Sequence, residues 1–222
     1  MTAQTDKAPD KQAQRDAIIR AALPHVPFDG WTQKTLAAAA ENAGLGAAAA
    51  LRLFPGGAKD AVLHFMNLAD REMIADLKSR DLAAMKIRER VTFGVRTRLE
   101  RWTPYREAVR RALALLPLPS VAGGVMRGWY DTVDAIWRAA GDRSTDFNYY
   151  TKRGLLAAVY GTTLLYWLDD RSEGCANTWA FLDRRINEVM QFPKLRGRIE
   201  ERLKMLPDPR RIFARLTGQA KI

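Results

Sequence analysis

Helical periodicity is the feature that most constrains the fold of this chain. Apolar side chains recur at intervals of three or four residues along most of its length, which is the spacing of one face of an α-helix. The clearest run predicts a long amphipathic helix over residues 58–82 and consists of Val62, Phe65, Ala69, Met73 and Leu77. A β-strand would show β-branched residues in alternation with polar ones, between turn-forming residues, and this pattern is absent from the sequence. We therefore expect an all-α protein without a sheet.

Proline and glycine divide this pattern into about nine to ten helices. The expected helices cover residues 18–26, 32–43, 47–54, 58–82, 91–102, 104–116, 126–137, 147–168, 179–189 and 195–206, with a last short helix from residue 210. Pro24 and Pro27 are expected to end the first helix, and Thr32 to cap the second. The stretch Gly154–Leu168 has no charged residue, which predicts a central helix buried on all sides.

Composition excludes several classes of site. The single cysteine, Cys175, and only two histidines exclude a disulfide scaffold, a zinc finger and an Fe–S centre, so no metal site is expected. No GxSxG motif is present, and we expect neither catalytic residues nor a cofactor.

Gly44–Ala49 matches the glycine pattern of dinucleotide sites, but a helix rather than a strand precedes it. No apolar run reaches the 18 to 20 residues or so of a membrane span, and the polar N-terminus predicts a cytoplasmic protein.

Gly44-Leu45-Gly46 joins two short helices, which is the signature of a helix-turn-helix. Its small core is expected to consist of Leu36, Ala40, Leu45 and Leu51. Three short helices followed by a long helical domain resemble the plan of Tet-repressor-like regulators. Residues 29–54 carry no net charge, and residues 47–54 offer only Arg52 to a nucleic acid. We therefore expect a vestigial helix-turn-helix without a nucleic-acid partner. The alternative is a ligand-responsive DNA-binding repressor of this type.

The net charge of +11 is concentrated in two stretches, residues 86–111 and 194–222, which each carry +6. Such stretches fit a nucleic acid or an anionic membrane surface as partner, and a solvated helix face with a solubilising tail is the alternative. In the second stretch the apolar Ile212, Phe213 and Leu216 lie on one side of a helix and the basic Arg210, Arg211 and Arg215 on the other. This pattern predicts a membrane-surface anchor, with a helix docked on the domain as the alternative.

The two helices around residues 126–137 and 147–168 are expected to form a hairpin. Four apolar residues of the first, Met126, Trp129, Val133 and Trp137, would then face Leu155, Leu156, Val159 and Tyr160 of the second. This arrangement is a candidate lipid pocket, and an ordinary packed core is the alternative.

The segment between these helices, residues 139–153, combines turn residues with adjacent aromatic and charged ones. Tyr149 and Tyr150 must point to different faces of a helix, so one of them is expected at the surface. An exposed aromatic ring beside arginine and aspartate is typical of a protein interface, and packing across the hairpin is the alternative.

Several stretches of the chain resemble the ubiquinone-biosynthesis accessory lipid-binding family, the ninth Coq protein. They are Val26–Thr32, Leu63–Phe65, Trp137–Arg153, Gly154–Thr163 and Thr178–Asn187, within a similarity that covers residues 14–192. The resemblance implies a Tet-repressor-like fold without catalytic activity. It also implies binding of an isoprenoid quinone intermediate or phospholipid, and presentation of this lipid at the membrane to a di-iron demethoxyubiquinone hydroxylase.

The resemblance further implies a set of partner-binding residues: Asp134, Ile136, Asp146, Tyr149, Tyr150 and Arg153. Tyr149 stands where eukaryotic members have tryptophan, and Ile136 where they have methionine. We expect a bacterial member that forms a homodimer and is peripheral on the inner membrane.

Four regions are expected on these grounds. They are a disordered N-terminus over residues 1–14, a helix-turn-helix-like subdomain over 15–57, a helical lipid-binding domain over 58–192 and a basic amphipathic tail over 193–222.

Overall fold

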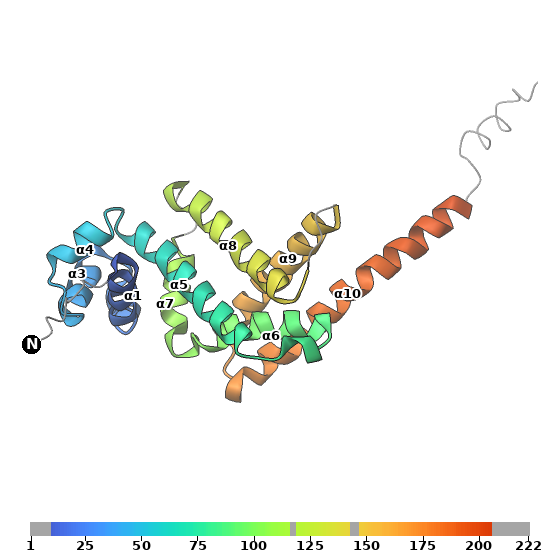
Figure 1. The fold of residues 1–222 in the computed structure, drawn as a ribbon, viewed down its shortest axis with the longest axis horizontal. Helices are drawn as coiled ribbons and strands as arrows, with labels where there is room; N and C mark the ends of the chain where they lie inside the picture. Colours follow the sequence, from blue (N-terminus) through green and yellow to red (C-terminus); the bar gives the residue numbers. More distant parts are fainter. Residues whose placement is uncertain (1–9, 116–118, 143–146, 206–222) are drawn as a thin grey trace, which may run out of the picture.

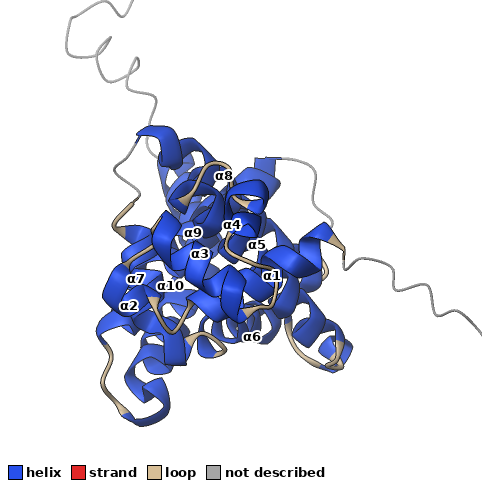
Figure 2. Ribbon diagram, turned by 90° about the vertical axis from the view of Figure 1, so that its left-hand side faces the viewer, coloured by secondary structure: helices blue, strands red, loops and turns tan. Residues whose placement is uncertain are grey.

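The computed structural model describes residues 10–115, 119–142 and 147–205, and within these ranges every regular element is a helix (Figure 2). The ten α-helices are α1 (Lys11–Ala22), α2 (Val26–Asp29), α3 (Gln33–Asn42), α4 (Ala48–Leu53), α5 (Ala58–Lys78), α6 (Ile87–Glu100), α7 (Arg106–Leu113), α8 (Pro119–Ala139), α9 (Phe147–Asp169) and α10 (Ala176–Met205). The all-α prediction, with about nine to ten helices, is confirmed.

The helices form two regions, which we call the N-terminal subdomain (α1–α4) and the helical body (α5–α10). In Figure 1 the subdomain lies at one end of the molecule, and α5 leads from it into the body. Helix α5 packs against α6 and α8, and α8 packs against α9. Helix α10 extends away from the rest at the opposite end (Figure 1). None of the helices in the described ranges is long and apolar enough to cross a membrane.

Local sequence explains the helix-turn-helix of the subdomain. The hydroxyl of Thr32 caps α3 by accepting a hydrogen bond from the backbone N–H of Thr35 at 3.1 Å. Gly44 and Gly46 both have φ near +72°, a conformation that glycine adopts without steric cost. The core differs from the expected one in one residue. Leu36 and Ala40 are buried and Leu45 is half-buried, whereas Leu51 is exposed, because α4 turns Ala49, Ala50 and Leu53 inward instead.

Three expected boundaries are wrong. Residues 11–14 belong to α1 and are not disordered, while residues 1–9 lie outside the described residues. The expected first helix is split after Ala22, and Pro27 lies in the first turn of α2 rather than ending a helix. Helix α10 runs across the expected boundary between residues 192 and 193 as far as Met205. Residues 206–222 lie outside the described residues.

The prediction that the charge-free part of α9 is buried on all sides is also wrong. Leu156, Leu164 and Trp167 are buried, but Leu165 is 61% exposed and Tyr166 is 40% exposed. The reason is geometric: α9 lies at the edge of the helical body, so that α8 and α10 cover only part of its surface. Lack of charge in a helix therefore does not require burial on every side.

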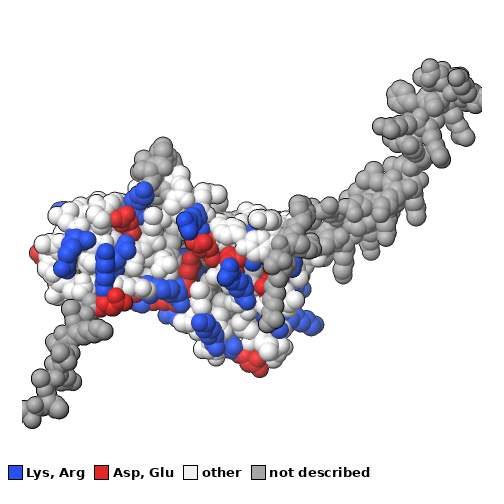
Figure 3. All heavy atoms as spheres, turned by 45° about the horizontal axis from the view of Figure 1, so that its top comes forward, with Lys and Arg blue, Asp and Glu red and all other residues white. Residues whose placement is uncertain are grey.

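The basic stretch of residues 86–111 is mostly paired with acidic side chains. Its ion pairs include Arg96–Glu100, Arg98–Asp70, Arg101–Asp76 and Arg110–Asp169. Figure 3 shows Lys and Arg atoms beside Asp and Glu atoms on one face of the molecule. This pairing favours the interpretation of the stretch as a solvated helix face over a membrane-binding surface.

Candidate functional site

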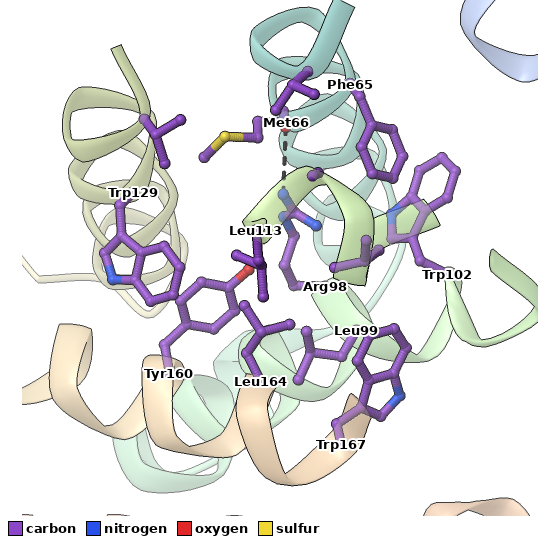
Figure 4. A pocket seen from close by; sticks show the side chains of 14 residues that line it. Phe65, Met66, Arg98, Leu99, Trp102, Leu113, Trp129, Tyr160, Leu164 and Trp167 are labelled. Carbon is purple, nitrogen blue, oxygen red and sulfur yellow. Dashed lines mark hydrogen bonds between the residues drawn. The ribbon is translucent and has the colours of Figure 1, made fainter. Parts of the chain in front are cut away.

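An apolar cavity lies inside the helical body, where α5, α6, α7, α8 and α9 meet (Figure 4). Aromatic rings make up much of its wall: Phe65, Trp102, Trp129, Tyr160 and Trp167. Its volume is about 50 Å³, whereas a cavity that holds a benzene ring measures about 150 Å³. In this conformation the cavity is therefore too small to hold a ring.

The packing of the rings explains why space remains between them. Phe65 meets Trp102 edge-on with ring centroids 4.9 Å apart, and Trp129 lies 4.8 Å from Tyr160. Gly161 of α9 permits this approach, because a Cβ atom there would lie 3.0 Å from Trp129. Such rigid rings pack in preferred tilted geometries and cannot reshape to fill every gap.

One charged group belongs to this otherwise apolar wall. The Arg98 Nε donates a hydrogen bond to Asp70 Oδ1 at 2.7 Å, and the Thr132 hydroxyl donates to the same carboxylate at 2.9 Å. Burial alone would lower the pKa of Arg98, but the adjacent Tyr160 and Asp70 raise it above its ordinary value. Arg98 thus remains charged inside the body, with Asp70 as its counter-ion.

The residues predicted to bind lipid are only partly brought together. Trp129 and Tyr160 lie on the cavity wall. The others do not line it: Val133, Trp137, Leu156 and Val159 are buried in the core, and Leu155 is half-buried. Met126 is 70% exposed and must be removed from the predicted set. Its neighbour Val125 faces the cavity, and successive side chains on a helix point about 100° apart.

Sequence reasoning missed the walls that α5, α6, α7 and Trp102 contribute. Phe65 belongs to a predicted periodic apolar face, but periodicity shows only that a residue is buried. Which buried residues border an empty space depends on how five helices meet, and no local signal encodes this.

A second candidate site, which we call the hairpin patch, lies where α8 meets the start of α9. It consists of Tyr130, Asp134, Tyr149, Tyr150 and Arg153. Asp134 accepts hydrogen bonds from Arg153 Nε at 2.7 Å and from the hydroxyl of Tyr149 at 3.3 Å. The hydroxyls of Tyr130 and Tyr149 are 2.6 Å apart. These bonds hold the polar atoms of the patch in one network.

Stacking fixes the rings of the hairpin patch. The guanidinium of Arg153 lies 3.4 Å from the ring centroid of Tyr149, and Tyr150 meets that ring edge-on at 5.1 Å. The hydrogen bond to Tyr149 raises the pKa of Tyr130 to about 12. Tyr149 is half-buried, whereas Tyr150 is 69% exposed. The prediction that one of the two tyrosines lies at the surface is confirmed.

The other predicted partner-binding residues take different places. Asp134 and Arg153 are buried and support the tyrosines from beneath. Ile136 is 1% exposed, so its assignment to a partner surface is wrong. Its side chain faces α6, where a Cβ atom on Gly94 would lie 2.9 Å from it. Asp146 lies outside the described residues, and the exposed Tyr130 was missed.

A groove of about 570 Å³ lies beside the hairpin patch, between α5 and α8. Its floor is apolar, with Ile74, Leu77 and Ala135, while Arg138 and Asp134 lie at its polar border. Arg138 also pairs with Asp134 at 2.6 Å, which links the groove to the hairpin patch. The predicted membrane-binding residues, from Arg210 to Leu216, lie outside the described residues.

Comparison with solved structures shows the fold. The crystal structure of a TetR transcriptional regulator from Nitrosomonas europaea matches 80% of this chain and 98% of its own with a TM-score of 0.66. The two sequences are 20% identical. The helical body and its N-terminal helix-turn-helix therefore have the Tet-repressor-like architecture.

Comparison with sequences identifies the relatives. The mitochondrial ubiquinone biosynthesis protein COQ9 of Homo sapiens is 37% identical over 182 residues, which are 79% of this chain and 57% of the human protein. The Drosophila melanogaster COQ9 protein is 36% identical over 198 residues, 86% of this chain and 60% of that protein. The chain thus spans less than two thirds of the length of these relatives. The COQ9 family model matches residues 123–193, which contain the hairpin patch, most of α8 and all of α9. The chain is thus similar to COQ9 proteins over most of its own length.

Proposed function

We propose that this protein is a non-catalytic lipid-binding accessory protein of ubiquinone biosynthesis, which presents a quinone intermediate to a di-iron demethoxyubiquinone hydroxylase. The observation that carries the proposal is an aromatic-walled cavity in a chain similar to proteins named for ubiquinone biosynthesis. A largely apolar pocket with a few polar groups is the usual form of a site for a small hydrophobic molecule.

Lipid binding requires the cavity to widen, because 50 Å³ cannot hold an isoprenoid chain. Met66 and Leu113 of its wall are only half-buried, and methionine adapts readily to a new partner. We expect lipid to co-purify with the protein and to be identified by mass spectrometry. A short-chain quinone should also raise the melting temperature. If no lipid is extracted and no quinone shifts the melting temperature, lipid binding is wrong.

The hairpin patch is the proposed surface for the hydroxylase. Replacement of a central interface residue typically costs about 2 kcal/mol or more of binding energy. We therefore expect Tyr150→Lys to abolish co-purification of the hydroxylase. The matched control is Phe28→Lys, since Phe28 is the most exposed large apolar residue of the described chain and lies in the N-terminal subdomain. Equal hydroxylase binding by both variants would contradict the proposal, provided that their circular dichroism spectra match that of the natural chain.

The basic tail is the proposed membrane contact. Each basic residue near an anionic surface contributes about 1 kcal/mol, an attraction that salt screens. Deletion of residues 210–222 should reduce flotation with vesicles of phosphatidylglycerol and leave the melting temperature unchanged. A lower melting temperature would show instead that the tail docks on the helical body.

A homodimer is proposed through the exposed side of α9. Leu165 and Tyr166 present apolar surface there, and Tyr166 stacks on Phe181 of α10 at 4.8 Å. We expect sedimentation analysis to give a dimer for the natural chain and a monomer for Leu165→Glu. A monomeric natural chain would remove this part of the proposal.

The Tet-repressor-like architecture favours one second candidate, a DNA-binding repressor. The α3–α4 pair offers only two basic side chains to phosphates, Lys34 and Arg52, while Glu41 would repel them. A gel-shift assay with genomic fragments at physiological salt separates the two functions, and a shifted band would favour the repressor.

A further inference from the structure

Arg98, the buried arginine of the cavity wall, has more N–H groups than hydrogen bonds. Arg98 is 7% exposed, and its Nε is bonded to Asp70. One N–H of Nη2 points to the carbonyl oxygen of Met66 at a long 3.4 Å. A guanidinium carries five N–H groups, and Arg98 uses two of them in hydrogen bonds within the described parts of the chain. Figure 4 shows this guanidinium among the side chains that line the cavity.

Tyr160 brings a second unused polar group to the same place. Its side chain is 4% exposed, and Figure 4 shows its oxygen directed toward the middle of the cavity, on the side of Arg98. Burial raises the pKa of Tyr160, so the hydroxyl keeps its proton and can donate a hydrogen bond. Among the described residues it has no hydrogen-bond partner. Buried polar groups without partners are uncommon, and they point to a ligand or water.

The charge balance limits what these donors can bind. Asp70 already neutralises Arg98, and Thr132 completes the hydrogen bonds of that carboxylate. A phosphate or carboxylate in the cavity would therefore add a buried charge without a counter-ion, which is strongly unfavourable. A neutral oxygen acceptor would satisfy the free N–H and O–H groups without this cost.

The remaining wall suits a flat ring. Trp129 and Trp102 flank the polar groups, and aromatic side chains favour stacked or edge-on contact with another ring. On the basis of the proposed function, we propose that Arg98 and Tyr160 hydrogen-bond to the oxygen atoms of a neutral, oxygenated aromatic head group, as in a quinone, and thereby select it over a phospholipid. The cavity must widen for this, because its volume of about 50 Å³ is too small for a ring.

The test removes one hydroxyl without changing the shape of the wall. Tyr160→Phe loses no hydrogen bond of the described chain, so its melting temperature should equal that of the natural protein. The matched control is Tyr166→Phe on the exposed side of the same helix. Titrations with three probes, followed by tryptophan fluorescence, give dissociation constants. The probes are a ubiquinone with two isoprene units, an isoprenoid hydrocarbon of similar length and a short-chain phosphatidylglycerol.

We expect Tyr160→Phe to weaken quinone binding about three- to tenfold, the usual effect of one hydrogen bond, and to leave hydrocarbon binding unchanged. Tyr166→Phe should change neither. Arg98→Lys, which keeps the charge but loses the planar donors, should weaken quinone binding further. If the natural protein binds the quinone and Tyr160→Phe binds it equally well, the head-group site is wrong while lipid binding stands. If Tyr160→Phe loses binding of phosphatidylglycerol and keeps binding of the quinone, the head-group site is also wrong. A natural protein that binds none of the probes would instead refute the proposed function.

Discussion

The N-terminal subdomain and the helical body fill their interiors in different ways. In the subdomain, α3 and α4 bury mainly alanines, such as Ala40 and Ala50, and small side chains let helices approach closely. In the body, rings such as those of Trp129 and Trp167 surround a cavity. The difference indicates that the cavity of the body is created by large, flat residues that cannot fill every gap. In the subdomain the small side chains let the helices pack closely against one another.

The largest expected effect concerns the buried ion pair at the cavity wall, Arg98–Asp70. Arg98→Met leaves Asp70 buried without its counter-ion, which should lower the free energy of unfolding by about 3–5 kcal/mol. Urea denaturation measures this change. The double variant Arg98→Met, Asp70→Leu should recover most of the loss, because Thr132 can still donate to the backbone of Gly128. If the double variant is as unstable as the single one, the loss comes from packing and not from charge.

A smaller effect tests the comparison directly with one substitution in each region. Ala40→Val overpacks the subdomain and should cost about 1–3 kcal/mol of unfolding free energy. Ala112→Val places the same two methyl groups at the cavity wall, and it should cost less than about 1 kcal/mol. Both changes carry the same small penalty for a β-branched residue in a helix. Thermal unfolding of the two variants measures the difference, and equal losses would show that the two interiors do not differ in spare volume.

The smallest expected effect lies at the junction of the two regions. His64 of α5 lies 2.6 Å from Asp16 of α1, which also accepts a hydrogen bond from Arg71 at 2.6 Å. Burial lowers the pKa of His64 below its ordinary 6.5, although Asp16 opposes this shift. The unfolded chain therefore binds the proton at a higher pH than the folded one. Stability should be complete above pH 6.5 and should decline as the pH falls through and below this value.

His64→Gln keeps a hydrogen-bond donor for Asp16 but cannot titrate. Melting temperatures of the natural chain and of this variant between pH 7.5 and pH 5 check the prediction. The decline should be shallower in His64→Gln. An identical pH profile would mean that His64 does not control the junction.

The sequence by itself determined the all-α class, the approximate helices and the similarity to COQ9 proteins. Helical spacing, the Thr32 cap and the glycines of the turn act over a few residues, so they can be read without knowledge of the rest of the chain. The aromatic pair Tyr149 and Tyr150 likewise predicted one exposed ring, because adjacent residues on a helix must face different directions.

Only the tertiary structure decided which side chains form the sites. Met126 and Ile136 belong to the same amphipathic helix, yet one points to solvent and the other into the core against α6. Arg98 looked like one of many basic residues, and only the approach of α5, α8 and α9 places it beside Asp70 and Tyr160 in a cavity. The physical reason is that helix formation is local, whereas the rotation of each helix about its axis is fixed by packing against distant segments.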